Sequence, residues 1–136
     1  MGSWRVDTSS WPIVVHSMEG TPGHEEIEAY IREATAVLYR REPHVVILDA
    51  SRMGKVSAHL RARTRQWQTE HRDALRSWCL GTAKVLVSPL TRFIAMTVLM
   101  VNPLPTPWTV CESLDEARAW AADLLARVNR SASPTV

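Results

Sequence analysis

The chain has 136 residues, of which 46% are hydrophobic and 22% charged, and 16 basic against 14 acidic side chains give a formal net charge of +2. These values are typical of one globular domain and exclude collagen-like and low-complexity proteins. Because the net charge is small, we expect no nucleic acid as a partner. The sequence has no window of about eighteen apolar residues, so we also expect no membrane insertion.

The sequence lacks the motifs of several common kinds of functional site. The five histidines form no HExxH or HxH pair, and there is no Walker loop or GxSxG elbow, so we expect no metal, no cofactor and no catalytic residues. Cys79 and Cys111 lack CxxC spacing and are interpreted as buried free thiols. The first ten residues lack the apolar stretch of a signal peptide, which predicts a cytoplasmic location.

The first third of the chain predicts two strands, a helix and a third strand. Residues 4–9 and 13–18 are β-rich and read as a hairpin or two consecutive strands. Thr21 and Pro22 are typical of a helix start, and apolar residues at helical spacing follow until Pro43. The aliphatic run at 44–49 then predicts a strand covered on both faces, as in a parallel sheet.

The rest of the chain continues this alternation. Residues 50–56 read as a loop, Ser57 as the N-cap of one long helix to about residue 78, and Gly81 as a break. Ser113 and Glu116 have capping-box spacing ahead of the last helix. The remaining predicted elements are a strand at 83–87, a helix at 90–101, a proline-rich loop at 103–107, a strand at 108–111 and a helix at 114–128.

The predicted order is therefore β-β-α-β-α-β-α-β-α. Strands that alternate with helices indicate an α/β fold with a mostly parallel sheet, and the opening strand pair can supply an antiparallel edge. We expect a single domain over residues 1–128 and a flexible C-terminal tail at 129–136.

An arginine stripe is the most structured polar signal. On a helical wheel, its members fall within about 60° of one another, beside the apolar face of the predicted helix. One interpretation is a solvated helix face, and a second is a docking surface for an acidic partner. A third is a site for anionic lipid or nucleic acid, although a stripe without interleaved aromatic residues is a weak signal for nucleic acid. The stripe consists of Arg61, Arg65, Arg72 and Arg76.

The helix at 90–101 is apolar almost all round. Such a helix is either buried on every side, here by the final helix or the proline-rich loop, or covers a partner. The candidate ligand wall or homodimer surface comprises Phe93, Ile94, Val98 and Val101.

Asp49 ends a predicted central strand, where α/β folds place ligand contacts, but an aspartate there also caps loops. An enzyme that combines Asp49 with His16 or His44 has no supporting arrangement in the sequence.

The order of elements, with the strand Val45-Val46-Ile47-Leu48-Asp49 after a capped helix, resembles a STAS-type domain over about residues 4–128. That group includes bacterial anti-sigma-factor antagonists and STAS-like proteins related to the CRAL-TRIO lipid-binding fold. The resemblance implies a non-enzymatic regulatory module that binds a protein with an acidic surface through the loop after Asp49 and the next helix. The implied docking residues are Ser51, Arg52, Lys55, Ser57, Arg61, Arg65, Arg72 and Arg76. The alternative is a carrier or sensor of a hydrophobic small molecule or lipid, with residues 90–101 lining its pocket.

The chain departs from the antagonists at their phosphorylation segment. Those proteins carry Asp-Ser-Ser/Thr-Gly at the start of the helix after the strand aspartate, whereas no Asp-Ser pair follows Asp49. Ser57 stands where that helix begins, so it is interpreted either as a plain N-cap or as a phosphorylation site, whose added charge the helix N-terminus would favour.

Overall fold

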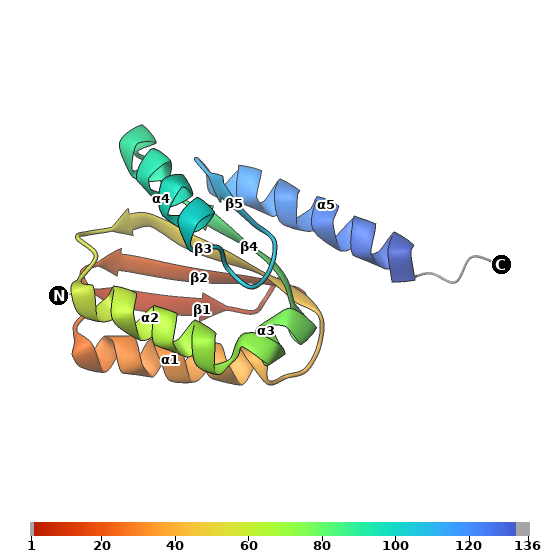
Figure 1. Ribbon diagram of the computed structural model, residues 1–136, viewed down its shortest axis with the longest axis horizontal. Helices are drawn as coiled ribbons and strands as arrows, with labels where there is room; N and C mark the ends of the chain where they lie inside the picture. Colours follow the sequence, from red (N-terminus) through yellow and green to blue (C-terminus); the bar gives the residue numbers. More distant parts are fainter. Residues whose placement is uncertain (1, 133–136) are drawn as a thin grey trace.

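The computed structural model describes residues 2–132, and residues 1 and 133–136 lie outside that description. A five-stranded sheet forms the centre, and its strands lie side by side in chain order (Figure 1). The first strand pairs antiparallel with the second, and all other neighbours are parallel, so the predicted mixed sheet with an antiparallel edge is confirmed. The strands are β1 (Ser3–Asp7), β2 (Ile13–Gly20), β3 (His44–Met53), β4 (Cys79–Val85) and β5 (Trp108–Cys111).

Helices cover both faces of the sheet. In Figure 1, α1 and α2 lie below the sheet and α5 lies above it. The helices are α1 (His24–Leu38), α2 (Ala58–Glu70), α3 (Arg72–Trp78), α4 (Pro89–Val101) and α5 (Leu114–Ala132).

Two apolar layers follow from the alternation of side chains along each strand. On one face, Val45 and Ile47 are fully buried against Ala117 and Ala121 of α5. On the other face, Ile27 and further apolar residues of α1 pack with Leu60 of α2. Both faces of β3 are therefore covered near its start, as its continuous aliphatic run predicts.

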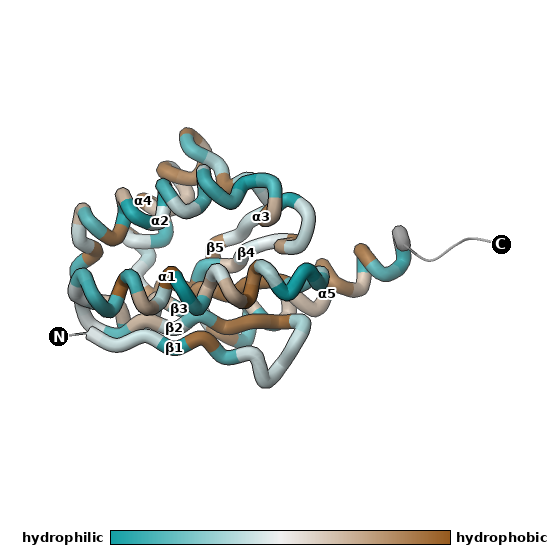
Figure 2. The backbone as a smooth tube through the Cα atoms, turned by 90° about the horizontal axis from the view of Figure 1, so that it is seen from below, coloured by the Kyte–Doolittle hydropathy of each residue, from teal (hydrophilic) through white to brown (hydrophobic). Residues whose placement is uncertain are grey.

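The helix α1 is amphipathic, and Figure 2 shows hydrophilic and hydrophobic segments alternating along it. Its start differs from the prediction, because Gly23 is the N-cap and Glu26 Oε1 accepts a hydrogen bond from the Gly23 amide at 3.2 Å. Thr21, the expected cap, donates its hydroxyl to the carbonyl of Lys55 at 3.2 Å and ties the loop before α2 to this corner.

The predicted single helix at 57–78 is wrong in one respect, since it breaks at His71 into α2 and α3. His71 Nδ1 lies 2.9 Å from Tyr39 Oη, and its ring contacts Trp67. The break redirects the chain so that Leu75 packs with Leu38 and Cys79 at the start of β4. The Ser57 cap is confirmed, with its Oγ accepting from the Leu60 amide at 3.1 Å.

Strand bounds also differ from expectation. β3 continues four residues past Asp49, and the fourth strand begins at Cys79, so Gly81 lies inside β4 instead of breaking the chain. A β-carbon at Gly81 would lie 2.7 Å from Leu124 Cδ2 and 2.8 Å from Trp120 Cη2. Glycine is therefore required here by the close approach of α5.

The last helix is longer than predicted. α5 extends to Ala132, past the expected end at residue 128, and its end projects beyond the sheet in Figure 2. Of the expected tail at 129–136, residues 133–136 lie outside the described residues.

Candidate functional site

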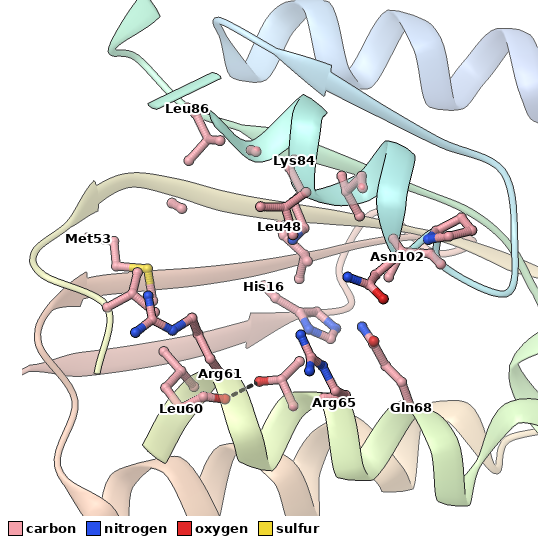
Figure 3. Close-up of a pocket in the computed structure, with 18 of the residues that line it drawn as sticks. His16, Leu48, Met53, Leu60, Arg61, Arg65, Gln68, Lys84, Leu86 and Asn102 are labelled. Carbon is pink, nitrogen blue, oxygen red and sulfur yellow. Dashed lines mark hydrogen bonds between the residues drawn. The ribbon is translucent and has the colours of Figure 1, made fainter. Parts of the chain in front are cut away.

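A cavity of about 820 Å³ lies between α2, α4 and the sheet. Figure 3 shows its floor, formed by strands β2, β3 and β4, with α2 on one side and α4 on the other. The floor has one row of register partners, His16, Leu48 and Lys84, on three adjacent strands. All three line the cavity, because side chains that are paired in register on neighbouring strands point to the same face of the sheet.

His16 is buried beneath the cavity and has one hydrogen-bond partner within the part of the chain that the structure describes. Its Nδ1 lies 2.6 Å from Tyr30 Oη of α1, and the two rings are edge-on at 5.4 Å. Burial lowers the pKa of His16 to about 4, so the imidazole is neutral at pH 7. Its Nε2 is buried without a hydrogen-bond partner among the described residues.

The protonation of this pair follows from the available acceptors. Burial raises the pKa of Tyr30, so the phenol keeps its proton. No other acceptor for that proton is present among residues 2–132, so we assign Tyr30 as donor to Nδ1. The His16 ring proton is then on Nε2, which leaves an N–H donor without an acceptor.

Lys84 is the cation on the cavity floor. Burial lowers the pKa of its amine, and no described residue forms a hydrogen bond or ion pair with that amine. Lys84 is partly buried, so its ammonium loses part of its hydration without gaining a counter-ion, which is costly.

The four arginines of the predicted stripe all line this cavity, although they are divided between α2 and α3. Their guanidinium groups have no carboxylate partner among the described residues. By contrast, Arg63 on another side of α2 bonds through Nε to Glu28 Oε2 at 2.9 Å. The stripe and the floor together give the cavity five cations, against the single carboxylate of Asp49.

The other predicted docking residues lie apart from the cavity. Ser51 and Arg52 belong to the extended β3 and not to a loop, and they line a second, smaller hollow that shares Met18 and Asp49 with the cavity. Ser51 Oγ donates to Asp49 Oδ1 at 2.6 Å, and Arg52 pairs with Glu19 at 3.2 Å. Lys55 is exposed, and the Ser57 hydroxyl is occupied as the α2 cap.

The helix α4 is not buried on every side. Ile94, Val98 and Val101 line the cavity and Leu99 is buried, whereas Phe93 does not line it and is 69% exposed; Val101 is itself 73% exposed. Neither α5 nor the proline-rich loop covers its outer face, so that expectation is wrong. Whether this face binds a ligand or a second chain stays a prediction.

The enzyme interpretation gains nothing from the geometry. Asp49 bonds to Ser51, and His44 Nδ1 donates to the carbonyl of Glu42 at 2.8 Å. Burial lowers the pKa of His44, whose ring stacks on Trp11. Among the described residues, no three His, Cys, Asp or Glu side chains are grouped as a metal site, and no helix is long and apolar enough to cross a membrane. Both cysteines are free and buried, as predicted.

Sequence reasoning missed the residues at the centre of the cavity. Figure 3 shows Arg65, Gln68 and Asn102 converging on His16. Of these three side chains, the sequence had indicated only Arg65 as a site residue. One available signal was Lys84, a charged residue within an otherwise aliphatic strand. His16 was a second signal, because it follows Val15 in a predicted strand. Consecutive side chains of a strand point to opposite faces, so His16 lies on the face away from the layer that Val15 joins.

Comparison with solved structures identifies the fold. A protein of the DUF3478 family from Shewanella loihica matches with a TM-score of 0.69 and 15% identity, over 88% of this chain and 93% of that chain. It is described as having a SpoIIAA-like fold. An anti-sigma factor antagonist from Mycobacterium paratuberculosis matches with a TM-score of 0.61 and 13% identity, over 90% of this chain and 96% of that one.

The chain has a SpoIIAA-like, or STAS, fold. The antagonist SpoIIAA in its unphosphorylated form also matches, with a TM-score of 0.62 and 13% identity, over 88% of this chain and 98% of the other. No protein family model and no curated protein matches the sequence. The STAS fold is thus shared across nearly the whole chain at low identity, and the α/β architecture expected from the order of elements is confirmed.

Proposed function

We propose that this chain is a non-enzymatic regulatory module that binds an acidic surface of another protein. The observation that carries the proposal is the arginine stripe of α2 and α3, whose guanidinium groups have no acidic partner among the described residues. Guanidinium groups form strong, bidentate hydrogen bonds with carboxylates, so such a row is suited to an acidic surface. Ser51, Arg52, Lys55 and Ser57 extend the proposed surface beyond the start of α2. The STAS fold supports the proposal, since two of the similar structures are anti-sigma factor antagonists.

Charge reversal tests this function. The double variant Arg61→Glu, Arg65→Glu is compared with Arg32→Glu, Arg130→Glu, whose two arginines are exposed on α1 and α5. Proteins that bind the wild type and the control variant in cell extract are identified, purified and titrated. We expect the stripe variant to lose at least about tenfold in affinity and the wild-type affinity to fall with added salt. Equal affinities would exclude the stripe as the docking surface.

Ser57 is the proposed switch in this surface. A phosphate there would lie at the N-terminus of α2, where the helix dipole favours negative charge. Intact-mass measurement on protein isolated from its own cells detects the added phosphate. Ser57→Ala removes the modification, whereas unmodified Ser57 under all growth conditions would leave it an N-cap alone.

A carrier or sensor of an apolar small molecule is the second candidate. It is favoured by the cavity, whose volume of about 820 Å³ lies within the range of small-molecule sites. Its α4 wall, with Ile94, Val98 and Leu99, is apolar. Native mass spectrometry separates the candidates, because a small adduct supports the carrier, a second polypeptide supports the docking module, and a homodimer supports self-association through the exposed face of α4.

A further inference from the structure

The floor of the cavity combines two unsatisfied polar groups with an apolar residue between them. His16 and Lys84 are both register partners of Leu48, so their Cα atoms are about 10 Å apart, two strand spacings. His16 offers an N–H donor without an acceptor, and Lys84 offers an ammonium without a counter-ion. The His16 donor is unusual, since buried polar groups in proteins are nearly always paired, and the partly buried Lys84 ammonium lines the same cavity without a counter-ion.

The surroundings determine the charge that would satisfy both groups. The cavity has five cations and one carboxylate, and that carboxylate already accepts the Ser51 hydroxyl. Among the residues that the structure describes, no acidic side chain pairs with Lys84 or Arg65. The missing partner is therefore an anion, and it must accept hydrogen bonds.

The apolar residues that line the cavity indicate the chemistry of the rest of the ligand. Leu48 lies between the two polar floor residues, and α4 supplies Ile94, Val98 and Leu99 opposite α2. Apolar atoms of a ligand would cover these side chains. A single ammonium with one neutral N–H donor matches the two oxygens and one charge of a carboxylate.

We infer that the cavity binds an amphipathic carboxylic acid, with its carboxylate held by Lys84, the His16 Nε2–H and Arg65 and its hydrocarbon body against Leu48 and α4. This inference rests on the second candidate function, the small-molecule carrier, and adds the chemistry of the head group. Tyr30 is a positioning residue in it, because its hydroxyl bond to Nδ1 holds the His16 ring with Nε2 protonated.

Three probes with the same chain length test the head group. Decanoate, decanol and decyl phosphate, each below its micelle concentration, are titrated into the full chain by calorimetry. We expect decanoate to bind between about tenfold and a hundredfold more tightly than decanol, the range for hydrogen bonds to charged groups. Lys84→Met should weaken decanoate binding and reduce this preference to below about tenfold, since His16 and Arg65 remain, whereas Arg32→Met, outside the cavity, should retain it in full.

The unliganded proteins provide a second measurement that needs no ligand. Lys84→Met replaces a partly buried, unpaired cation by an apolar side chain of similar length, so we expect its melting temperature to exceed that of the wild type. With saturating decanoate, the wild type should gain more thermal stability than the variant. A variant that is less stable than the unliganded wild type would show that Lys84 is already compensated and would overturn the inference.

The outcomes separate this inference from the carrier function. Equal binding of decanoate and decanol, with no effect of Lys84→Met, would support a carrier and overturn the carboxylate site. Preference for decyl phosphate over decanoate would overturn the carboxylate assignment in favour of a phosphate head group. Binding of none of the three probes would overturn both the inference and the carrier function.

Discussion

The Nδ1 of His16 and the hydroxyl of Tyr30 lie 2.6 Å apart and join β2 to α1 beneath the cavity. Tyr30→Phe removes the hydrogen-bond partner that this buried nitrogen has among residues 2–132. We expect the free energy of unfolding to fall by about 1–3 kcal/mol, the cost of an unsatisfied buried group. Urea denaturation measures it. Tyr39→Phe is the matched control, since its bond to His71 Nδ1 at 2.9 Å is exposed, and it should cost at most about 1 kcal/mol. Equal losses would contradict the assignment.

The free energy of unfolding should decrease as the pH is lowered, because His16 binds a proton more readily in the unfolded chain than in the folded protein. The pKa of this residue is about 4 in the folded protein and 6.5 when exposed. The unfolded state therefore binds more protons between these values, so stability is fully present above pH 6.5 and is lost as pH falls toward 4. His16 should account for a loss of about 2 kcal/mol between pH 7 and pH 5. The depressed pKa of His44 acts in the same direction.

Denaturation at both pH values checks this loss. The His16→Gln variant removes the titrating group, so the difference in unfolding free energy between pH 7 and pH 5 should shrink by about that amount, whatever its absolute stability. An unchanged difference would assign the pH dependence to other groups.

Gly81 is expected to tolerate no side chain. The β-carbon of Gly81→Ala would overlap Leu124 and Trp120, so α5 must shift from the sheet. We expect a loss of about 1–3 kcal/mol in thermal or urea unfolding. Gly23→Ala is the control, because its β-carbon meets only the flexible Glu26 carboxylate at 3.2 Å, and its cost should stay below about 1 kcal/mol. The prediction fails when the two variants are equally stable.

Two Arg–Glu ion pairs should differ in their contribution to the free energy of unfolding, because one is more buried than the other. The Arg63–Glu28 pair joins α2 to α1, with side chains 21% and 31% exposed, whereas Arg52 and Glu19 are 78% and 55% exposed. We expect Arg63→Met to cost about 1–2 kcal/mol and Arg52→Met less than about 0.5 kcal/mol. Salt should weaken only the second pair appreciably. Denaturation of both variants at low and high salt provides the comparison.

Local patterns predict most of the fold because they report on the apolar layers directly. The aliphatic run of β3 indicates cover on both faces, and Val45 and Val46 do face opposite layers. Predictions failed where a distant contact decides the geometry. His71 ends α2 through its contacts with Tyr39 and Trp67, and Gly81 belongs to a strand because α5 needs the space above it.

The candidate site was predictable in part for the same reason. Helical spacing places Arg61 and Arg65 on one face of α2, but the break at His71 puts Arg72 and Arg76 on α3, so a single helical wheel does not account for all four lining the cavity. The row of His16, Leu48 and Lys84 depends on strand register, which joins residues far apart in the sequence. A single sequence provides no measure of that register, so the floor of the cavity emerged only from the structure.

The order in which the two apolar layers can form has a consequence for synthesis. Of the helices described, α5 alone packs on the face with Val45 and Ile47, and it is the last element in the chain. On the ribosome, that face stays uncovered until Ala117 and Ala121 have left the exit tunnel, although all five strands precede them. A nascent chain stalled before α5 would therefore present a bare aliphatic sheet, a surface that chaperones bind and that aggregates when they do not.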